Sequence, residues 1–233
     1  MQPIAHGPLS ALVADVTRLF GTRLEAVVAY GRDRREGQHS LVLVSSLTVD
    51  DLNALALAAP RWRDAGVATP LVMPRDEFAR SLDAFPLEYG EIIDTHTVLV
   101  GTDPFDGMHV DLEDVRRAVE VRLTSHLVHL RENFIEGGGR LKAVDALVRA
   151  AAPEFAALLR RVARLYGESH ADARALASWA QAHLGLEART VGDILALATD
   201  DATPVEGVRI YPDYLAVATR LRQLVDQWSP AQQ

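Results

Sequence analysis

The apolar pattern of the chain changes character near residue 110. Before this point, short β-branched runs such as LEAVVAY, LVLV and THTVLV alternate with amphipathic stretches, a pattern typical of strands and helices in alternation. After it, long segments rich in Ala, Leu and Arg repeat their apolar residues every three or four positions, which predicts helices. The sequence therefore predicts an α+β protein. A small mixed sheet with helices on one face, over residues 1–108, should precede an all-helical bundle over residues 109–233.

The first half is predicted to run helix, strand, strand, helix, strand, helix, strand. A basic turn, RDRREGQHS, joins the first two strands. Thr48 should cap the second helix, which Pro60 is expected to kink or shorten. The segment FPLEYGEIID is expected to be a connection that packs through Phe85, Leu87 and Tyr89.

The second half is predicted to begin with one long helix that ends before three consecutive glycines, Gly137 to Gly139. On this helix His126 and His129 share a face, and we expect it to be polar, because no third ligand for a metal lies at a suitable spacing. The later helices are expected over residues 141–151, 153–166 with Pro153 in the first turn, 171–183, 191–198 and 212–228.

Composition excludes several classes of protein. The chain of 233 residues has no cysteine, which excludes disulfides, thiolate nucleophiles and cysteine-ligated zinc. No apolar run approaches the roughly 18 residues of a membrane helix, and no basic and then apolar leader begins the chain, so we expect a cytoplasmic protein without a membrane partner. The net charge of −8 repels polyanions, so we expect no nucleic-acid partner. The exception to this acidic balance is a compact cluster, Arg32, Arg34 and Arg35.

Two segments, AVVAYGRDRREGQHSLVLV and FPLEYGEIIDTHTVLVGTDPF, resemble a bacterial group of nucleotidyltransferase-like proteins with a helical C-terminal domain. Members of that group carry a strand ending in Tyr-Gly-Ser, a variable turn, and Ser-Asp-x-Asp or Ser-Asp-x-Asn on the next strand. They also carry a Phe-Pro-x-Glu-(Phe/Tyr) segment and a Val-Leu-x-Gly-x-Asp-Pro-Phe strand. The resemblance covers residues 9–110 and, in outline, the helical remainder. It implies a HEPN-like or kanamycin-nucleotidyltransferase-C-terminal-like helical domain.

The resemblance implies magnesium chemistry, because paired aspartates on one strand can share a metal that neutralises the triphosphate. This chain departs from that pattern. Ser40 and Val42 stand at the two aspartate positions, Arg32 replaces the serine that would contact phosphate, and Gly31 is retained. The strand TPLVM, which carries a third carboxylate in the family, has none. A hydroxyl and an isopropyl group cannot replace anionic ligands, so we expect a degenerate active site with no catalytic residue, metal or cofactor.

These residues leave three functions open. The first is a noncatalytic ligand-binding or regulatory module, in which Arg32, Arg34 and Arg35 bind an anionic small molecule or else form a solvated turn. The second is a divergent, magnesium-dependent nucleotidyltransferase acting on a nucleoside triphosphate, with Asp33 and Glu36 recruited as ligands. The third, implied by the family alone, is one component of a toxin–antitoxin-like system. The first function is favoured because it does not require the missing carboxylates.

The helical half is expected to serve as a partner surface. Helical domains that accompany nucleotidyltransferases often form homodimers, and some are RNases that use an arginine followed a few residues later by histidine. Arg164 with His170 and Arg122 with His129 fit that spacing loosely. We expect these residues to cap helices or lie on the surface. The sequence leaves open a homodimer that forms through this half.

Overall fold

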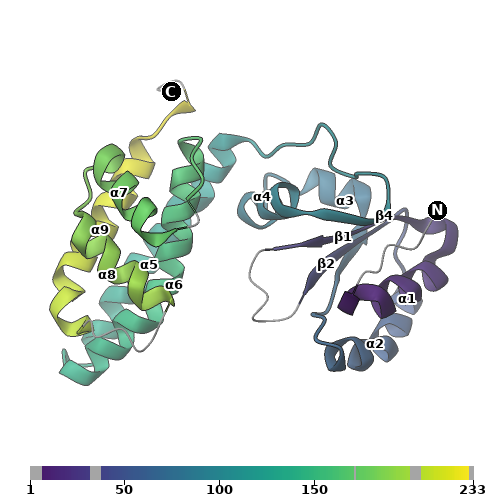
Figure 1. Cartoon of the computed structure of the whole chain (residues 1–233), viewed down its shortest axis with the longest axis horizontal. Coiled ribbons are helices and arrows are strands. Elements are labelled where there is room, and N and C mark those ends of the chain that lie inside the picture. Colours follow the sequence, from purple (N-terminus) through teal and green to yellow (C-terminus); the bar gives the residue numbers. More distant parts are fainter. Residues whose placement is uncertain (1–6, 32–37, 171, 200–205, 231–233) are drawn as a thin grey trace. The chain divides into compact units, whose positions relative to one another are not determined.

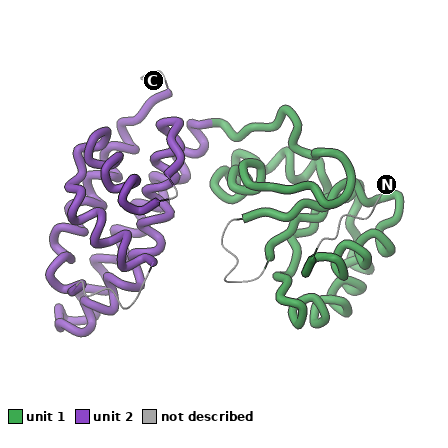
Figure 2. The backbone as a smooth tube through the Cα atoms, viewed as in Figure 1, with its two compact units in different colours: residues 1–111 green, residues 112–233 purple. Residues whose placement is uncertain are grey.

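The computed structural model describes residues 7–31, 38–170, 172–199 and 206–230. Figure 2 shows two compact units, Met1–Asp111 and Leu112–Gln233. Each unit has its own buried core.

The first unit follows the predicted element order and adds one helix. Figure 1 shows it built around a small sheet. The FPLEYGEIID segment, expected to be a connection, is instead a helix, because Pro86 at its first turn has a backbone angle that suits a helix start. Of its three expected packing residues, Leu87 and Tyr89 are buried, whereas Phe85 is 51% exposed. The elements are α1 (Ser10–Phe20), β1 (Leu24–Tyr30), β2 (His39–Val44), α2 (Val49–Asp64), β3 (Leu71–Pro74), α3 (Arg75–Arg80), α4 (Pro86–Thr95) and β4 (Thr97–Gly101).

The sheet is mixed, as predicted. Among the described residues its strand order is β3-β2-β1-β4. Strand β1 runs antiparallel to both β2 and β4, and β2 runs parallel to β3. In the β1–β2 pair, Ala29 lies opposite Ser40 and Val27 lies opposite Val42. The two positions that matter for the family resemblance therefore lie on an inner strand.

Helices cover both faces of the sheet, not the one face that was expected (Figure 1). Because side chains alternate along a strand, Val42 and Val44 face α1 and α2, whereas Leu41 and Leu43 face α3 and α4. The run LVLV is thus apolar throughout because both of its faces are buried, which is typical of an inner strand between two layers.

The start of α2 is held by polar contacts. Thr48 caps the helix as predicted: its side chain accepts a hydrogen bond from the Asp51 N–H, and the Asp51 carboxylate accepts one from the Thr48 N–H. Arg23 donates to both carboxylate oxygens of Asp51, at 2.7 and 2.8 Å. The expected shortening at Pro60 does not occur, and the helix continues to Asp64.

The second unit is an all-helical bundle, as predicted. The expected break before Pro153 is absent: one continuous helix runs through it, because its buried face, including Val148, Phe155 and Leu159, continues on both sides of the proline. Pro212 likewise lies inside the last helix rather than at its start. The helices described are α5 (Leu112–Glu136), α6 (Leu141–Leu165), α7 (Ala173–Leu184), α8 (Ala188–Thr199) and α9 (Gly207–Gln227).

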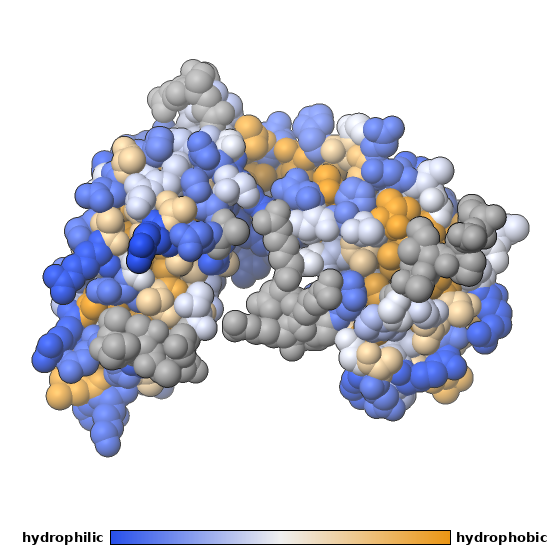
Figure 3. Space-filling view, in the orientation of Figure 1, coloured by the Kyte–Doolittle hydropathy of each residue, from blue (hydrophilic) through white to orange (hydrophobic). Residues whose placement is uncertain are grey.

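No helix of the described residues is both long enough and apolar enough to cross a membrane. On the face shown in Figure 3, hydrophilic residues predominate and apolar residues form smaller patches between them.

Candidate functional site

The backbone at the end of β1 has a geometry that requires glycine. Gly31 has a φ of +84°, in the region that side-chain-bearing residues rarely adopt. A Cβ added there would meet no atom closer than 3.8 Å, so backbone conformation rather than space fixes the residue. Its N–H donates to Thr95 Oγ1 at 3.1 Å, and that hydroxyl donates to the Glu91 carbonyl at 2.7 Å. The last turn of α4 therefore fixes the point at which the basic turn begins.

The far end of the same turn is also fixed. The Gln38 N–H donates to the Gly66 carbonyl at 3.2 Å, and the Gln38 carbonyl accepts from the Ala68 N–H at 3.3 Å. The residues between these anchors, including Arg32, Arg34 and Arg35 and the carboxylates Asp33 and Glu36, lie outside the described residues.

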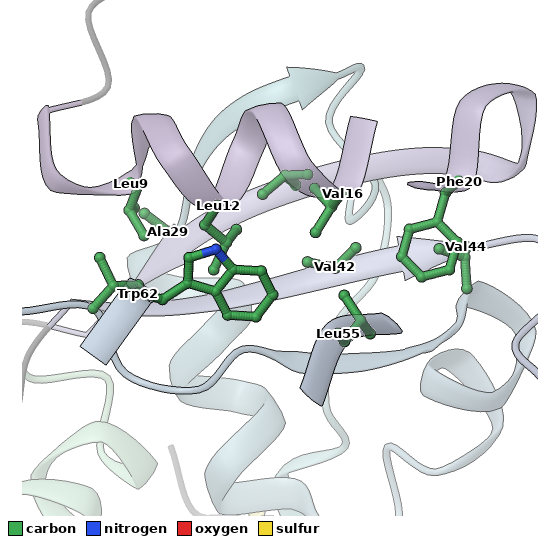
Figure 4. Packing of buried hydrophobic residues seen from close by; sticks show 11 residues of the cluster. Leu9, Leu12, Val16, Phe20, Ala29, Val42, Val44, Leu55 and Trp62 are labelled. Atoms are coloured by element: carbon green, nitrogen blue, oxygen red, sulfur yellow. The ribbon is translucent and has the colours of Figure 1, made fainter. Parts of the chain in front are cut away.

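Val42, which the resemblance predicts to stand at the second aspartate position, lies inside an apolar core. Its side chain is fully buried between the sheet and helices α1 and α2. Figure 4 shows it between Val16 of α1 and Leu55 of α2, with Leu12 and Trp62 nearby. An anionic group in this place would lose its hydration without gaining a partner, which is costly.

Ser40, which the resemblance predicts to stand at the first aspartate position, is 1% exposed, and in the described part of the chain its Oγ has no hydrogen-bond partner. A shift of one residue in the alignment would not restore carboxylates to β2. The alternative pair, Leu41 and Leu43, is equally buried in the core beneath α3 and α4. Neither face of β2 therefore carries a carboxylate at the positions where the resemblance predicts metal ligands.

The neighbouring strands do not supply the missing ligands. β3 reads LVMP, and the carboxylate of β1, Glu25, is exposed at the end of the strand away from Gly31. Within the described ranges, no three residues from His, Asp and Glu come together as a metal site would require.

Two polar features near Gly31 were not anticipated from the sequence. Burial, followed by the negative charge of Glu91, raises the pKa of Tyr30, whose ring stacks on that of His39. Next to Thr95, the His96 ring lies between two acceptors: its Nδ1 is 2.8 Å from the Ile93 carbonyl oxygen, and its Nε2 is 3.2 Å from Asp103 Oδ1.

The turn at Asp103 could have been recognised, because an aspartate that bonds the backbone N–H two residues on is typical of Asp-Pro-Phe turns. Here Asp103 Oδ1 accepts from the Phe105 N–H at 2.9 Å. The histidine contact could not, since it joins the end of a helix to a loop beyond the next strand.

In the helical unit the structure corrects the expectation for His126, which is 2% exposed rather than on a polar surface. Its Nε2 lies 2.8 Å from the Tyr214 hydroxyl, and its Nδ1 lies 3.1 Å from Glu154 Oε2. The Tyr214 hydroxyl also donates to the Ala151 carbonyl at 3.1 Å. These contacts join α5, α6 and α9.

The other arginine–histidine residues are spread over the bundle. His129 is 65% exposed and lies 3.5 Å from Glu132. His170 lies after α6, against the ring of Trp179, and its Nε2 is 3.7 Å from Glu168 Oε2. Arg122 is exposed on α5, and Arg164 lies in the last turn of α6.

Comparison of the sequence with protein-family models gives no match, and none of the curated proteins matches it. A solved structure does match: spectinomycin adenyltransferase AAD(9) from Enterococcus faecialis, crystallised with ATP and spectinomycin. The TM-score is 0.53, and the match covers 92% of this chain and 98% of the other. The chain has a nucleotidyltransferase-like fold. At 11% identity the likeness is one of fold. The nucleotidyltransferase-like fold here combines the mixed sheet with the helical second unit, and the match spans both.

Proposed function

We propose that this chain is a noncatalytic protein with a nucleotidyltransferase-like fold that acts as a ligand-binding or regulatory module. The observation that carries this proposal is the burial of Val42 in an apolar core with apolar residues on both faces of β2. Magnesium requires hard anionic oxygens and sheds its water reluctantly, and this strand offers none.

The ligand we propose is a small anion bound by the basic turn without metal. Arg32 directly follows Gly31 in the sequence, and the backbone N–H of Gly31 donates to Thr95, so the residue before the basic turn is held in place. Arginine suits this task because its planar guanidinium can donate two parallel hydrogen bonds to a phosphate. Asp33 and Glu36 limit the net positive charge of the turn, which favours a compact anion over a polyanion.

Calorimetric titration of the purified chain with ATP, with magnesium and then with EDTA, tests the proposal. Binding should be equal in the two conditions and should be lost in Arg32→Ala. Arg209→Ala is the matched control, because that side chain is 79% exposed on α9 of the other unit. Binding that appears only with magnesium would contradict a metal-free site, and the absence of any ATP binding would contradict the proposed ligand class.

A divergent active nucleotidyltransferase is the second candidate, favoured by the structural match to an adenyltransferase that was crystallised with ATP. Asp33 and Glu36 would then hold the metal. Pyrophosphate release from ATP and magnesium, with spectinomycin as the first acceptor tried, measures this directly. Turnover that is lost in both Asp33→Asn and Glu36→Gln would establish this candidate, and turnover unchanged in these variants would point to contamination.

A further inference from the structure

A groove of about 650 Å³ lies between α1 and α2. Its volume falls in the range of small-molecule sites, roughly 300–1,000 Å³. The two helices run antiparallel, since Asp15 of α1 bonds to residues near the end of α2 whereas Arg23, just after α1, bonds to Asp51 at its start.

The base of the groove is apolar, and it is open because the side chains of α2 that face α1 there are small. Ala54 and Ala58, four residues apart, lie on one face of α2 and leave room above Leu19 and Leu55. Leu57, which is 87% exposed, forms an apolar rim. An apolar ligand lying here would cover surface that the chain leaves in contact with water.

One end of the groove carries a fixed pair of arginines. Asp15 is 11% exposed, and its two carboxylate oxygens accept from Arg18 Nη2, at 3.1 Å, and from Arg61 Nη2. Trp62 Nε1 donates to the same carboxylate at 2.9 Å. Burial raises the pKa of Asp15, but the hydrogen bonds from Trp62 and Arg61 outweigh burial, so the pKa lies below its usual value. Asp15 is therefore ionised, and its carboxylate holds the guanidinium groups of Arg18 and Arg61 next to each other.

The two arginines keep donors for a ligand. Their side chains are 76% and 60% exposed, and each guanidinium has five N–H donors, of which Asp15 takes only part. With two arginines and one aspartate, the charges lining the groove sum to +1, which matches a single negative charge.

We propose that the α1–α2 groove binds small amphiphilic carboxylates, with the carboxylate between Arg18 and Arg61 and the apolar chain over Ala54 and Ala58. Asp15 acts as a positioning residue that orients both arginines from beneath. This site is separate from the basic turn of the proposed function, so either can fail without the other.

Calorimetric titration with octanoate, octanol and acetate tests the site. Octanoate should bind saturably at one molecule per chain. Octanol, which lacks the charge, and acetate, which lacks the chain, should each bind at least ~tenfold more weakly, because the groove contributes both apolar area and charge pairing. Absence of saturable octanoate binding, or equal binding of octanoate and octanol, would overturn the proposal.

Substitutions in and beside the groove test where octanoate binds. Ala54→Leu keeps a good helix former but fills the groove, so octanoate binding should be lost. Arg61→Gln should weaken it about three- to fivefold, the effect of one exposed ion pair. Arg63→Gln, at an exposed residue of α2 outside the groove, is the control and should bind like the parent, as should Arg32→Ala.

A thermal melt of each variant shows whether it is folded. If Arg61→Gln does not fold, Ala54→Leu decides, because it leaves all three charged residues in place. Unchanged octanoate binding in folded Ala54→Leu would place the ligand elsewhere and overturn the proposal.

Discussion

Two buried positions of the first unit differ in charge: one holds an ionised carboxylate and the other an apolar side chain. At the start of α2, Asp51 is 4% exposed and ionised, with both carboxylate oxygens bonded to Arg23 and further bonds from Thr48. In the middle of β2, Val42 is fully buried within a cluster of apolar side chains. The comparison shows that a carboxylate can be buried in this fold where an arginine and a helix cap bond to it. Strand β2 provides neither partner. Asp51 therefore has a structural role, since it holds Arg23 and the start of α2.

The largest effect should come from placing a family-like aspartate on β2. Val42→Asp buries an anion without a partner, and we expect it to lower the free energy of unfolding by about 4 kcal/mol or more. Urea denaturation measures the loss. Val42→Ala, which leaves only a cavity, is the control and should cost about half as much. Equal costs for the two variants would show that an anion is accommodated there.

Removing the partnered carboxylate should have the next largest effect. Asp51→Ala removes the carboxylate that accepts from the Thr48 N–H and both hydrogen bonds from Arg23, so we expect a loss of about 2 to 3 kcal/mol. Asp50→Ala, at the exposed neighbouring residue in the same first turn, should change stability by about 0.5 kcal/mol. If the two variants lose the same amount, the Arg23 contact contributes nothing.

The same carboxylate gives a pH dependence of known sign. The hydrogen bonds from Arg23, then those from Thr48, outweigh burial and hold the pKa of Asp51 far below its usual 3.8. Its stabilisation is therefore present above about pH 4 and is lost as the pH falls through the lower folded-state value. Parent and Asp51→Ala stabilities should converge on acidification below about pH 4. A constant difference down to pH 2 would contradict this assignment.

A smaller effect tests partnered burial in the second unit. Tyr214→Phe leaves His126 Nε2 and the Ala151 carbonyl without their partner, so we expect a loss of about 1 to 2 kcal/mol in urea denaturation. Tyr211→Phe removes a single bond to the Leu130 carbonyl and should cost less. The reverse order would show that the His126 contact does not stabilise the bundle.

The smallest effect should come from the unpartnered position on β2. Because the Ser40 Oγ has no bonded partner among the described residues, Ser40→Ala should change the free energy of unfolding by less than about 0.5 kcal/mol. A loss above about 1 kcal/mol would mean that this hydroxyl is engaged in solution, and the apolar account of β2 would need revision.

Local patterns predicted much of the fold. The strands around the basic turn, the Thr48 cap and the all-helical second unit follow from periodicity and capping chemistry, which act between residues close in sequence. The helix at Pro86 was missed because a short segment containing Phe-Pro and Gly90 resembles a turn. Pro153 was predicted to begin a new helix, but packing of the buried face on both sides of it outweighs one lost hydrogen bond, and the helix is continuous.

The candidate site could be predicted from the sequence only in part. The replacement of two aspartates by Ser40 and Val42 is visible in the letters, whereas their burial depends on helices α1 and α2, which come from either side of the first two strands in sequence. The continuous apolar run LVLV indicates a strand buried on both faces, so it already argued against helices on one face only. His126 was misassigned because its partners, Glu154 and Tyr214, come from distant helices.

Diffraction from crystals grown with ATP and Mn²⁺ as a substitute for magnesium tests the central claim most directly, since manganese is located by its anomalous signal. The account predicts no manganese within coordination distance of any β2 residue. Manganese bound beside Ser40 or Val42 would contradict it.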